Sequence, residues 1–269
     1  MKTYIVDSFT NEAFKGNPAG VCFPKNEISN DSMLNIAKEL GLSETAFVWE
    51  TEKDNTYKIR YFSPKKEIPL CGHATLASAK VLFKIDGVKH IHFITGENLD
   101  LFIARENDEI IMEFPTYQTI AIQNPVAISN ALGLAAITNS VYSEKNKIIL
   151  LEIDDAAILS ALKPDFKALV DSYSGINGVL VTAPSNVPDF DYHYRYFWPW
   201  AGTDEDPVTG GVQTFLARYW AKKLGKTKMN AYQSSKRSGI MEVELKGDKV
   251  LLKSQAVIIF EGNFVAFDQ

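Results

Sequence analysis

RYFSPKKEIPLCGHATLASAK (Arg60–Lys80) and RYFWPWAGTDEDPVTGGVQTFLARYW (Arg195–Trp220) share one pattern: Arg-Tyr-Phe, one residue, a proline, a glycine-containing turn and an apolar helix. The two copies begin 135 residues apart, which is half of the 269-residue chain. A repeat at half the chain length indicates two similar halves rather than a solenoid. The sequence therefore predicts two domains with the same order of elements.

Matching strands flank the two copies. Period-two alternation predicts strands in YKIRYF (57–62) and in DYHYRYFW (191–198), at the start of each copy. Further strands are predicted in KTYIVDSF, VCF, ETAFVWE, HIHFIT, LDLFIARE and EIIMEF of the first half, and in GVLVTAP, GIMEVELK, KVLLKSQAVIIFEG and NFVAF of the second. Each half is predicted to be a curved, mostly antiparallel sheet around one apolar helix, an α+β arrangement. The domains are placed at 1–118 and 119–269.

Two more helices are predicted, the first of them from its capping residues. SNDSMLNIAKELG (29–41) has Ser, Asn and Asp at its start, apolar residues at helical spacing and Gly41 as its end. A further helix is predicted in DDAAILSALK (154–163). The helix after LCGH is apolar on almost every face and is predicted to be enclosed.

Composition and charge exclude several function classes. With 28 basic and 33 acidic residues the formal charge is −5, so a nucleic-acid footprint is not expected. We expect no membrane span, a cytoplasmic protein and two free thiols, Cys22 and Cys71. His90 and His92 lack further ligands and DEDP (204–207) reads as a solvated acidic turn, so no metal site is predicted.

The two glycine turns are candidate ligand sites. A helix N-terminus offers free N–H groups and a partial positive charge, which suits a small carboxylate. The first turn carries Cys71, Gly72 and His73, and the second carries Asp206, Thr209, Gly210 and Gly211. The alternative is that these glycines only allow close packing of helix against sheet. Duplication at matching positions favours a site.

Glu44 is the candidate acid and base. It lies in LSETAFV (42–48), where a strand begins directly after a helix end. By itself this glutamate also fits a solvated turn residue.

Four blocks in order along the chain resemble the PhzF-like phenazine biosynthesis protein family. They are DSFTNEAFKGNPAGV (7–21), LSETAFV (42–48), RYFSPKKEIPLCGHATLA (60–77) and GTDEDPVTGG (202–211). The resemblance implies a diaminopimelate-epimerase-like fold with two pseudo-symmetric domains, an active site in the cleft between them and a homodimer. It also implies that Glu44 is the catalytic acid and base.

The same resemblance implies a substrate-binding set of Gly72, His73, Asp206, Gly210 and Gly211. Asn17, Cys71, Thr209 and Gln213 are further candidates. The chain departs from the family where the family's Gly-Ser-Ala-His reads Gly210, Gly211, Val212 and Gln213. A missing hydroxyl changes which polar substrates bind, so specificity is not carried over.

The predicted function is that of a cofactor-independent isomerase that moves a proton within a small carboxylic or amino acid. Racemases of this fold use two thiols, but the second turn has Asp206 and no cysteine. One carboxylate can instead take a proton from one carbon and return it to another. Three alternatives stay open: a racemase or epimerase that uses Glu44 with Cys71, a non-catalytic metabolite-binding protein, and a thiol hydrolase built on Cys71 that lacks an evident third group.

Overall fold

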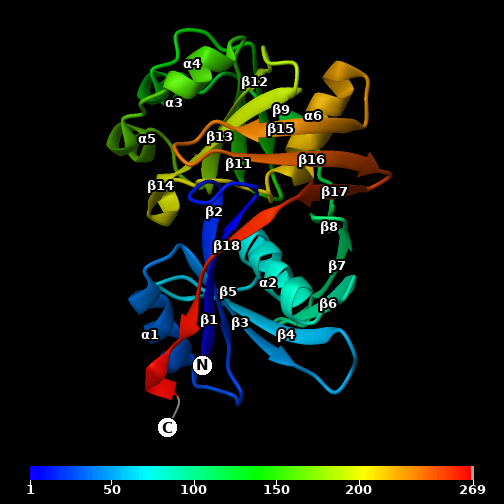
Figure 1. Cartoon of the computed structure of the whole chain (residues 1–269). Coiled ribbons are helices and arrows are strands. Elements are labelled where there is room, and N and C mark those ends of the chain that lie inside the picture. The colour runs from blue at the N-terminus through cyan, green and yellow to red at the C-terminus, as the bar shows by residue number, and fades with distance from the viewer. Residues whose placement is uncertain (268–269) are drawn as a thin grey trace. The chain divides into compact units, whose positions relative to one another are not determined.

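The computed structural model describes residues 1–267 of the chain, which divides into two compact units (Figure 1). Unit 1 comprises Met1–Glu113 and the segment from Leu252 onward, and unit 2 is Phe114–Leu251. The sequence placed the boundary near residue 118 and assigned the whole of 119–269 to the second half. The C-terminal segment instead returns to unit 1, because its strand pairs with the first strand of the chain over the full register from Lys2↔Asn263 to Ser8↔Ala256.

Unit 1 has one sheet and two α-helices. Its sheet runs in the order β18-β1-β2-β3-β4-β6-β7-β8, with β5 paired to β4. The elements are β1 (Lys2–Ser8), β2 (Asn17–Phe23), α1 (Asn30–Leu40), β3 (Glu44–Glu50), β4 (Thr56–Phe62), β5 (Glu67–Ile68), α2 (Gly72–Ile85), β6 (His90–Thr95), β7 (Asp100–Glu106), β8 (Glu109–Pro115), β18 (Ala256–Asn263) and η2 (Val265–Phe267).

Unit 2 is built on a second sheet in the order β9-β10-β11-β12-β13-β15-β16, with β14 paired to β13. The elements are β9 (Ile120–Ala121), α3 (Val126–Leu132), β10 (Asn139–Ser143), β11 (Ile148–Glu152), α4 (Ala156–Ala161), α5 (Phe166–Ser172), β12 (Gly178–Pro184), β13 (Tyr192–Trp198), η1 (Pro199–Ala201), β14 (Thr203–Glu205), α6 (Gln213–Leu224), β15 (Lys228–Gln233), β16 (Gly239–Lys246) and β17 (Lys249–Ser254).

Strand pairing within each unit confirms the internal repeat. In unit 1, β2 and β3 are parallel, β3 and β4 antiparallel, and β4 and β6 parallel with α2 between them in sequence. In unit 2, β11 and β12 are parallel, β12 and β13 antiparallel, and β13 and β15 parallel with α6 between them. The two halves therefore share one folding pattern, as the duplicated motif predicts.

The repeated helices differ in burial. In α2 the run from His73 to Ala79 is entirely buried, as its apolar sequence predicts. In α6 the first turns and Trp220 are buried, whereas Lys222 and Lys223 near its end face solvent. The helix of unit 1 is enclosed along most of its length and that of unit 2 only in its first half.

Most predicted elements are present, and some segments differ. In α1, the Ser29 side chain accepts a hydrogen bond from the Ser32 N–H, and Gly41 ends the helix with a φ of 64°. The short helices α3 and α5 were not predicted. NFVAF (263–267) was predicted as a strand, but β18 ends at Asn263, Phe264 still exchanges backbone hydrogen bonds with Met1, and Val265–Phe267 form the 3₁₀ turn η2.

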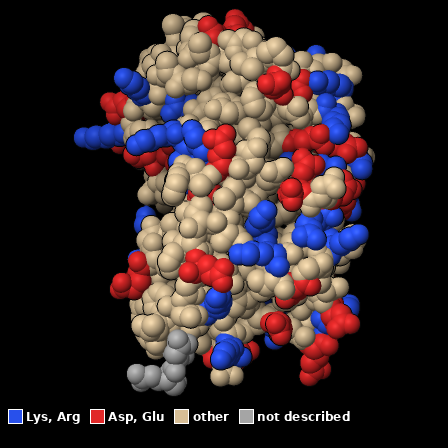
Figure 2. Space-filling model, in the orientation of Figure 1, with Lys and Arg blue, Asp and Glu red and all other residues tan. Residues whose placement is uncertain are grey.

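Two further properties of the chain are the distribution of its surface charge and the length of its helices. Figure 2 shows basic and acidic side chains interspersed on the face displayed, in line with the formal charge of −5. None of the helices in residues 1–267 combines the length and the apolar run that a membrane span needs.

Candidate active site

Glu44 and His73 form the centre of the candidate site in unit 1. Glu44 is the first residue of β3, and His73 is the second residue of α2. Both are 8% exposed, and Glu44 Oε2 lies 3.2 Å from His73 Nε2. Residues 29 positions apart in the sequence thus meet in a desolvated contact, and Glu44 is not the solvated turn residue that its local sequence alone allows.

Cys71 and Asn17 contact the His73 ring at Nδ1. His73 Nδ1 is 3.4 Å from Cys71 Sγ and 3.3 Å from Asn17 Nδ2, and Ser43 Oγ is 3.4 Å from Nε2. Since a carboxylate accepts but does not donate, the Nε2 proton is directed to Glu44, and Nδ1 accepts from the Asn17 amide. The order thiol, imidazole, carboxylate supplies the third group that the sequence did not reveal for a nucleophilic Cys71.

Burial keeps His73 neutral. Desolvation lowers the pKa of His73 below its ordinary value of 6.5, and the attraction of the Glu44 carboxylate only partly opposes this. A neutral imidazole donates one hydrogen bond and accepts another, so His73 can donate a hydrogen bond to the Glu44 carboxylate without carrying a charge itself.

Backbone contacts fix the turn that carries these side chains. The Ser8 hydroxyl donates to the His73 carbonyl at 2.8 Å. The Thr75 hydroxyl donates to the Cys71 carbonyl at 2.7 Å and contacts the Tyr61 hydroxyl at 2.6 Å. The predicted residues Glu44, Cys71, His73 and Asn17 are thereby brought together, with Gly72 as the first residue of α2.

In unit 2, the predicted residues Asp206, Thr209, Gly210 and Gly211 form one loop before α6, which we call the 206–211 loop. The Thr209 hydroxyl donates to the Asp206 carboxylate. The Thr209 N–H donates to Gln233 Oε1 at 2.7 Å, and Gln233 Nε2 donates to the Asp206 carbonyl at 2.6 Å. The loop is therefore held at Asp206 and at Thr209 by one buried amide of β15.

Gln213 and Gly211 shape the start of α6. The Tyr192 hydroxyl donates to Gln213 Oε1 at 2.6 Å, and Gln213 is fully buried. A Cβ added at Gly211 meets no heavy atom within 4 Å, so the position that carries serine in the family pattern is open here. The 206–211 loop therefore has room beside Gly211 and a fixed amide at Gln213.

Sequence reasoning missed several residues of both groups. Ser43 touches His73, and Gln233, Ser235 and Tyr194 bond to the 206–211 loop. Ser43 precedes Glu44 in the quoted block, so the block itself could have indicated it. Gln233 ends an ordinary strand, and only the parallel pairing of β13 with β15 brings it to the loop.

The duplicated Arg-Tyr-Phe motif places an equivalent ion pair in each unit. Arg60 Nε and Nη2 each lie 2.7 Å from a carboxylate oxygen of Glu67. Arg195 Nε and Nη2 lie at the same distances from Glu205. Each pair joins strand β4 or β13 to the short strand β5 or β14, which leads to the glycine turn. We call the two pairs the arginine clamps.

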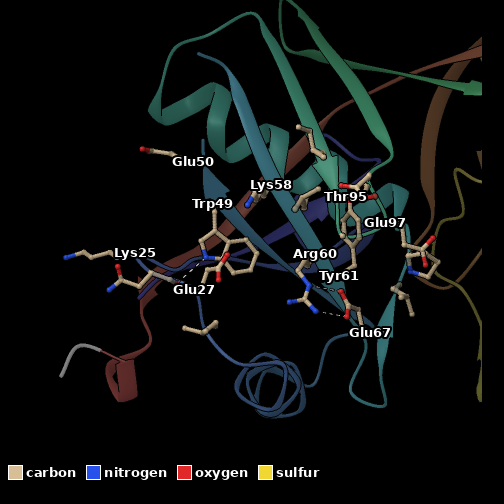
Figure 3. Close-up of a pocket in the computed structure, with 18 residues that line it drawn as sticks. Lys25, Glu27, Trp49, Glu50, Lys58, Arg60, Tyr61, Glu67, Thr95 and Glu97 are labelled. Carbon is tan, nitrogen blue, oxygen red and sulfur yellow. Dashed lines mark hydrogen bonds and ion pairs between the residues drawn. The ribbon is translucent and has the colours of Figure 1, made fainter. Parts of the chain in front are cut away.

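One pocket of unit 1 contains none of the predicted site residues. It has a volume of about 750 Å³, and Figure 3 shows the Arg60–Glu67 clamp and Trp49 on its walls. None of its 18 lining residues is a predicted site residue. Its lining contains both cations and carboxylates, and the clamp pairs Arg60 with Glu67.

The two motifs discounted as metal sites have local partners. His92 Nε2 is 2.6 Å from Asp100 Oδ1, and its ring stacks on Phe102 at 4.6 Å. In DEDP, Glu205 forms the clamp with Arg195 and is not a solvated turn residue. Ligand atoms of Glu44, Cys71 and His73 lie within 4.8 Å of one another, a grouping that the sequence did not predict.

Comparisons with known proteins agree with this architecture. A family model described as phenazine biosynthesis-like protein matches residues 6–262. A Pseudomonas aeruginosa protein named as an uncharacterized isomerase is 38% identical and covers 96% of each chain. The crystal structure of a putative phenazine biosynthesis PhzC/PhzF protein from Clostridium difficile aligns with a TM-score of 0.88 and 38% identity, over 98% of this chain and 99% of that one.

A more distant likeness concerns the fold alone. The crystal structure of a probable proline racemase from Agrobacterium radiobacter aligns with a TM-score of 0.59 and 11% identity, over 99% of this chain and 94% of that one. The predicted α+β, epimerase-like fold class is confirmed.

Proposed function

Because the chain belongs to the phenazine biosynthesis-like PhzC-PhzF family, we propose that it is a cofactor-independent isomerase that moves a proton within a small carboxylic or amino acid. The coarser conclusion, an enzyme of the isomerase or epimerase type, follows from the family and from a relative named as an isomerase over 96% of its length. The finer proposal assigns both proton-transfer steps to Glu44.

One observation carries the proposal: a buried carboxylate that contacts a neutral histidine. Glu44 Oε2 is 3.2 Å from His73 Nε2, so Oε1 is the oxygen assigned to proton transfer. Taking the proton from one carbon makes Glu44 a neutral acid, and returning it to another carbon restores the carboxylate. His73 stabilises the carboxylate through its Nε2–H in the resting state and at the end of the cycle.

The 206–211 loop is assigned to substrate binding. The loop ends at the N-terminus of α6, a 12-residue helix whose first-turn dipole favours an anionic group. That one substrate contacts this loop and Glu44 together stays a prediction, as do a homodimer and a cytoplasmic location. A KM increase in Asp206→Asn with turnover retained would support the binding role.

The test is solvent-deuterium incorporation into a pool of small carboxylic and amino acids, followed by mass spectrometry. Wild type should label one metabolite, and Glu44→Gln should lower the labelling rate about 10²–10⁴-fold. Glu50→Gln is the matched control, because Glu50 lies at the other end of β3 and is exposed. Full activity of Glu44→Gln would contradict the assignment.

A racemase or epimerase is the second candidate, because Cys71 Sγ lies 3.4 Å from His73 Nδ1 and offers a second proton donor. Incubation of separate enantiomers distinguishes the two reactions. A racemase converts each enantiomer into the other, whereas the proposed isomerase converts its substrate into a positional isomer and does not interconvert enantiomers. In Cys71→Ser the racemase loses activity and the isomerase keeps most of it. Binding of a metabolite without labelling by wild type would favour the non-catalytic alternative.

A further inference from the structure

We propose that Glu44, Cys71 and His73 form a three-ligand site for Zn²⁺, and that the bound ion blocks the enzyme instead of serving it. The metal-binding half of the proposal stands on the geometry of the three side chains alone. The inhibition half rests on the proposed function of Glu44.

The distances between the three ligand atoms are close to those of a zinc site. With Zn–S near 2.3 Å and Zn–N and Zn–O near 2.0–2.2 Å, neighbouring atoms of a tetrahedral site are about 3.4–3.6 Å apart. Glu44 Oε2 is 3.2 Å and Cys71 Sγ is 3.9 Å from His73 Nε2, and the set lies within 4.8 Å. Cys71 Sγ is closer to Nδ1, at 3.4 Å, so its side chain must rotate toward Nε2 for all three atoms to surround one ion.

The kinds of ligand select the metal. A thiolate, an imidazole and a carboxylate suit Zn²⁺, whereas Mg²⁺ and Ca²⁺ prefer oxygen ligands alone. Three protein ligands also leave a fourth position for water. The thiolate and the carboxylate together balance the charge of the ion, which matters because all three side chains are less than 10% exposed.

Binding requires two changes around the cluster. Cys71 releases its thiol proton to solvent when Sγ bonds to the metal. Coordination through His73 Nε2 moves the ring proton to Nδ1, where Asn17 lies 3.3 Å away. A 180° rotation of the Asn17 amide presents its oxygen to that proton and orients the ring, as partners of metal-bound histidines commonly do.

Bound Zn²⁺ would prevent proton transfer by Glu44. A carboxylate oxygen bonded to Zn²⁺ no longer takes a proton from carbon, and the ion occupies the space beside Glu44. Zn²⁺ binding and turnover are therefore competing states of the same three side chains.

Titration of the full-length protein with Co²⁺ tests the site, because Co²⁺ takes zinc-like geometry and a cobalt–thiolate bond gives a charge-transfer absorption in the near ultraviolet. We expect this band at one Co²⁺ per chain, and its loss when Zn²⁺ is added. Cys71→Ser should abolish the band, and Glu44→Gln should weaken Zn²⁺ affinity by about tenfold or more.

Two control variants guard against binding elsewhere. Cys22→Ser should keep the band, because burial raises the pKa of the Cys22 thiol to about 12 and it stays protonated. His92→Ala should keep it too, which excludes a surface site beside Asp100. Circular dichroism checks that each variant is folded.

The outcomes separate the two halves of the proposal. Absence of the band in folded wild type, or its persistence in Cys71→Ser, overturns the metal site. Full deuterium labelling by Zn²⁺-saturated enzyme overturns the inhibition while leaving the site. A band in a protein that labels no metabolite supports the site and counts against the proposed function.

Discussion

At the residue scale, the candidate site combines side chains that the sequence indicated with others that it did not. Glu44 and His73 were predicted through family resemblance, and local pattern alone gave them weak support. The sequence did not indicate Gln233 as a candidate, because its contact with the 206–211 loop depends on the pairing of β13 and β15, which no local pattern encodes. Site residues were thus predictable where a motif carries them and not where only tertiary pairing does.

The neutral state of His73 makes the free energy of unfolding depend on pH. Burial lowers its pKa below 6.5, so the unfolded state binds more protons as pH falls below about 6.5. The free energy of unfolding then falls with decreasing pH, by at most about 1.4 kcal/mol per pH unit for this group. Urea unfolding at several pH values should show a shallower acid slope in His73→Gln than in wild type.

His193 is the internal comparison for that experiment. Burial lowers its pKa as well, although it has no carboxylate contact like that of His73 with Glu44. His193→Gln should remove its own share of the slope, and the two effects should add because the residues lie in different units. An unchanged slope in His73→Gln would show that His73 is not held neutral by the fold.

At the element scale, side-chain capping accounts for only some of the predicted helices, since α2 and α6 were predicted and have no such cap. The α1 helix has Ser29 and Gly41 at its ends, and α4 has the side chain of Asp155 on the Ala157 N–H. The missed helix α3 starts after Pro125 with no side-chain cap. The missed helix α5 does have a cap, Asp165 on the Ala168 N–H, so its sequence carried a signal that was overlooked.

The arginine clamps give a matched stability prediction. The Arg195 side chain is 9% exposed and that of Glu205 17%, against 27% and 37% for Arg60 and Glu67. Arg195 Nη1 also donates to the carbonyls of Leu159 and Leu162 around the end of α4. Its removal leaves a largely buried carboxylate and several carbonyls without their donor.

Arg195→Met should therefore lower the free energy of unfolding by about 3–5 kcal/mol, the cost of breaking a buried pair. Arg60→Met should cost about 1 kcal/mol or less, because its pair is half exposed. Urea denaturation of the two variants measures the difference. Equal losses would mean that burial does not set the strength of the clamps.

At the scale of the whole molecule, the repeat predicted two similar halves, but not that the chain returns to unit 1 at its end. The β18 strand pairs with β1, and the terminal amine of Met1 donates to the Phe264 carbonyl at 3.1 Å. The apolar pattern of VLLKSQAVIIFEG predicts strands without naming their partner. Composition and periodicity therefore determine the class of each unit better than the path of the chain between them.

Removal of residues 256–269, which leaves β17 of unit 2 intact, should destabilise unit 1 selectively. The truncation deletes the strand on the outer side of β1 and leaves that ladder without a partner. Hydrogen exchange should show lost amide protection in β1 and β2, with β12 and β13 of unit 2 protected as before. If β1 and β2 of the truncated chain kept the same amide protection as β12 and β13, the assignment of the C-terminal segment to unit 1 would be contradicted.

The position in unit 2 that corresponds to Glu44 limits how the chain can diverge. Gly178 begins β12 as Glu44 begins β3, and a Cβ there would lie 2.6 Å from the Phe197 carbonyl oxygen and 2.6 Å from Tyr196 Cε2. No single substitution can place a glutamate at this point without displacing backbone. If Glu44 is the base, as proposed, a variant with a base in both halves must take its second base from another element of unit 2.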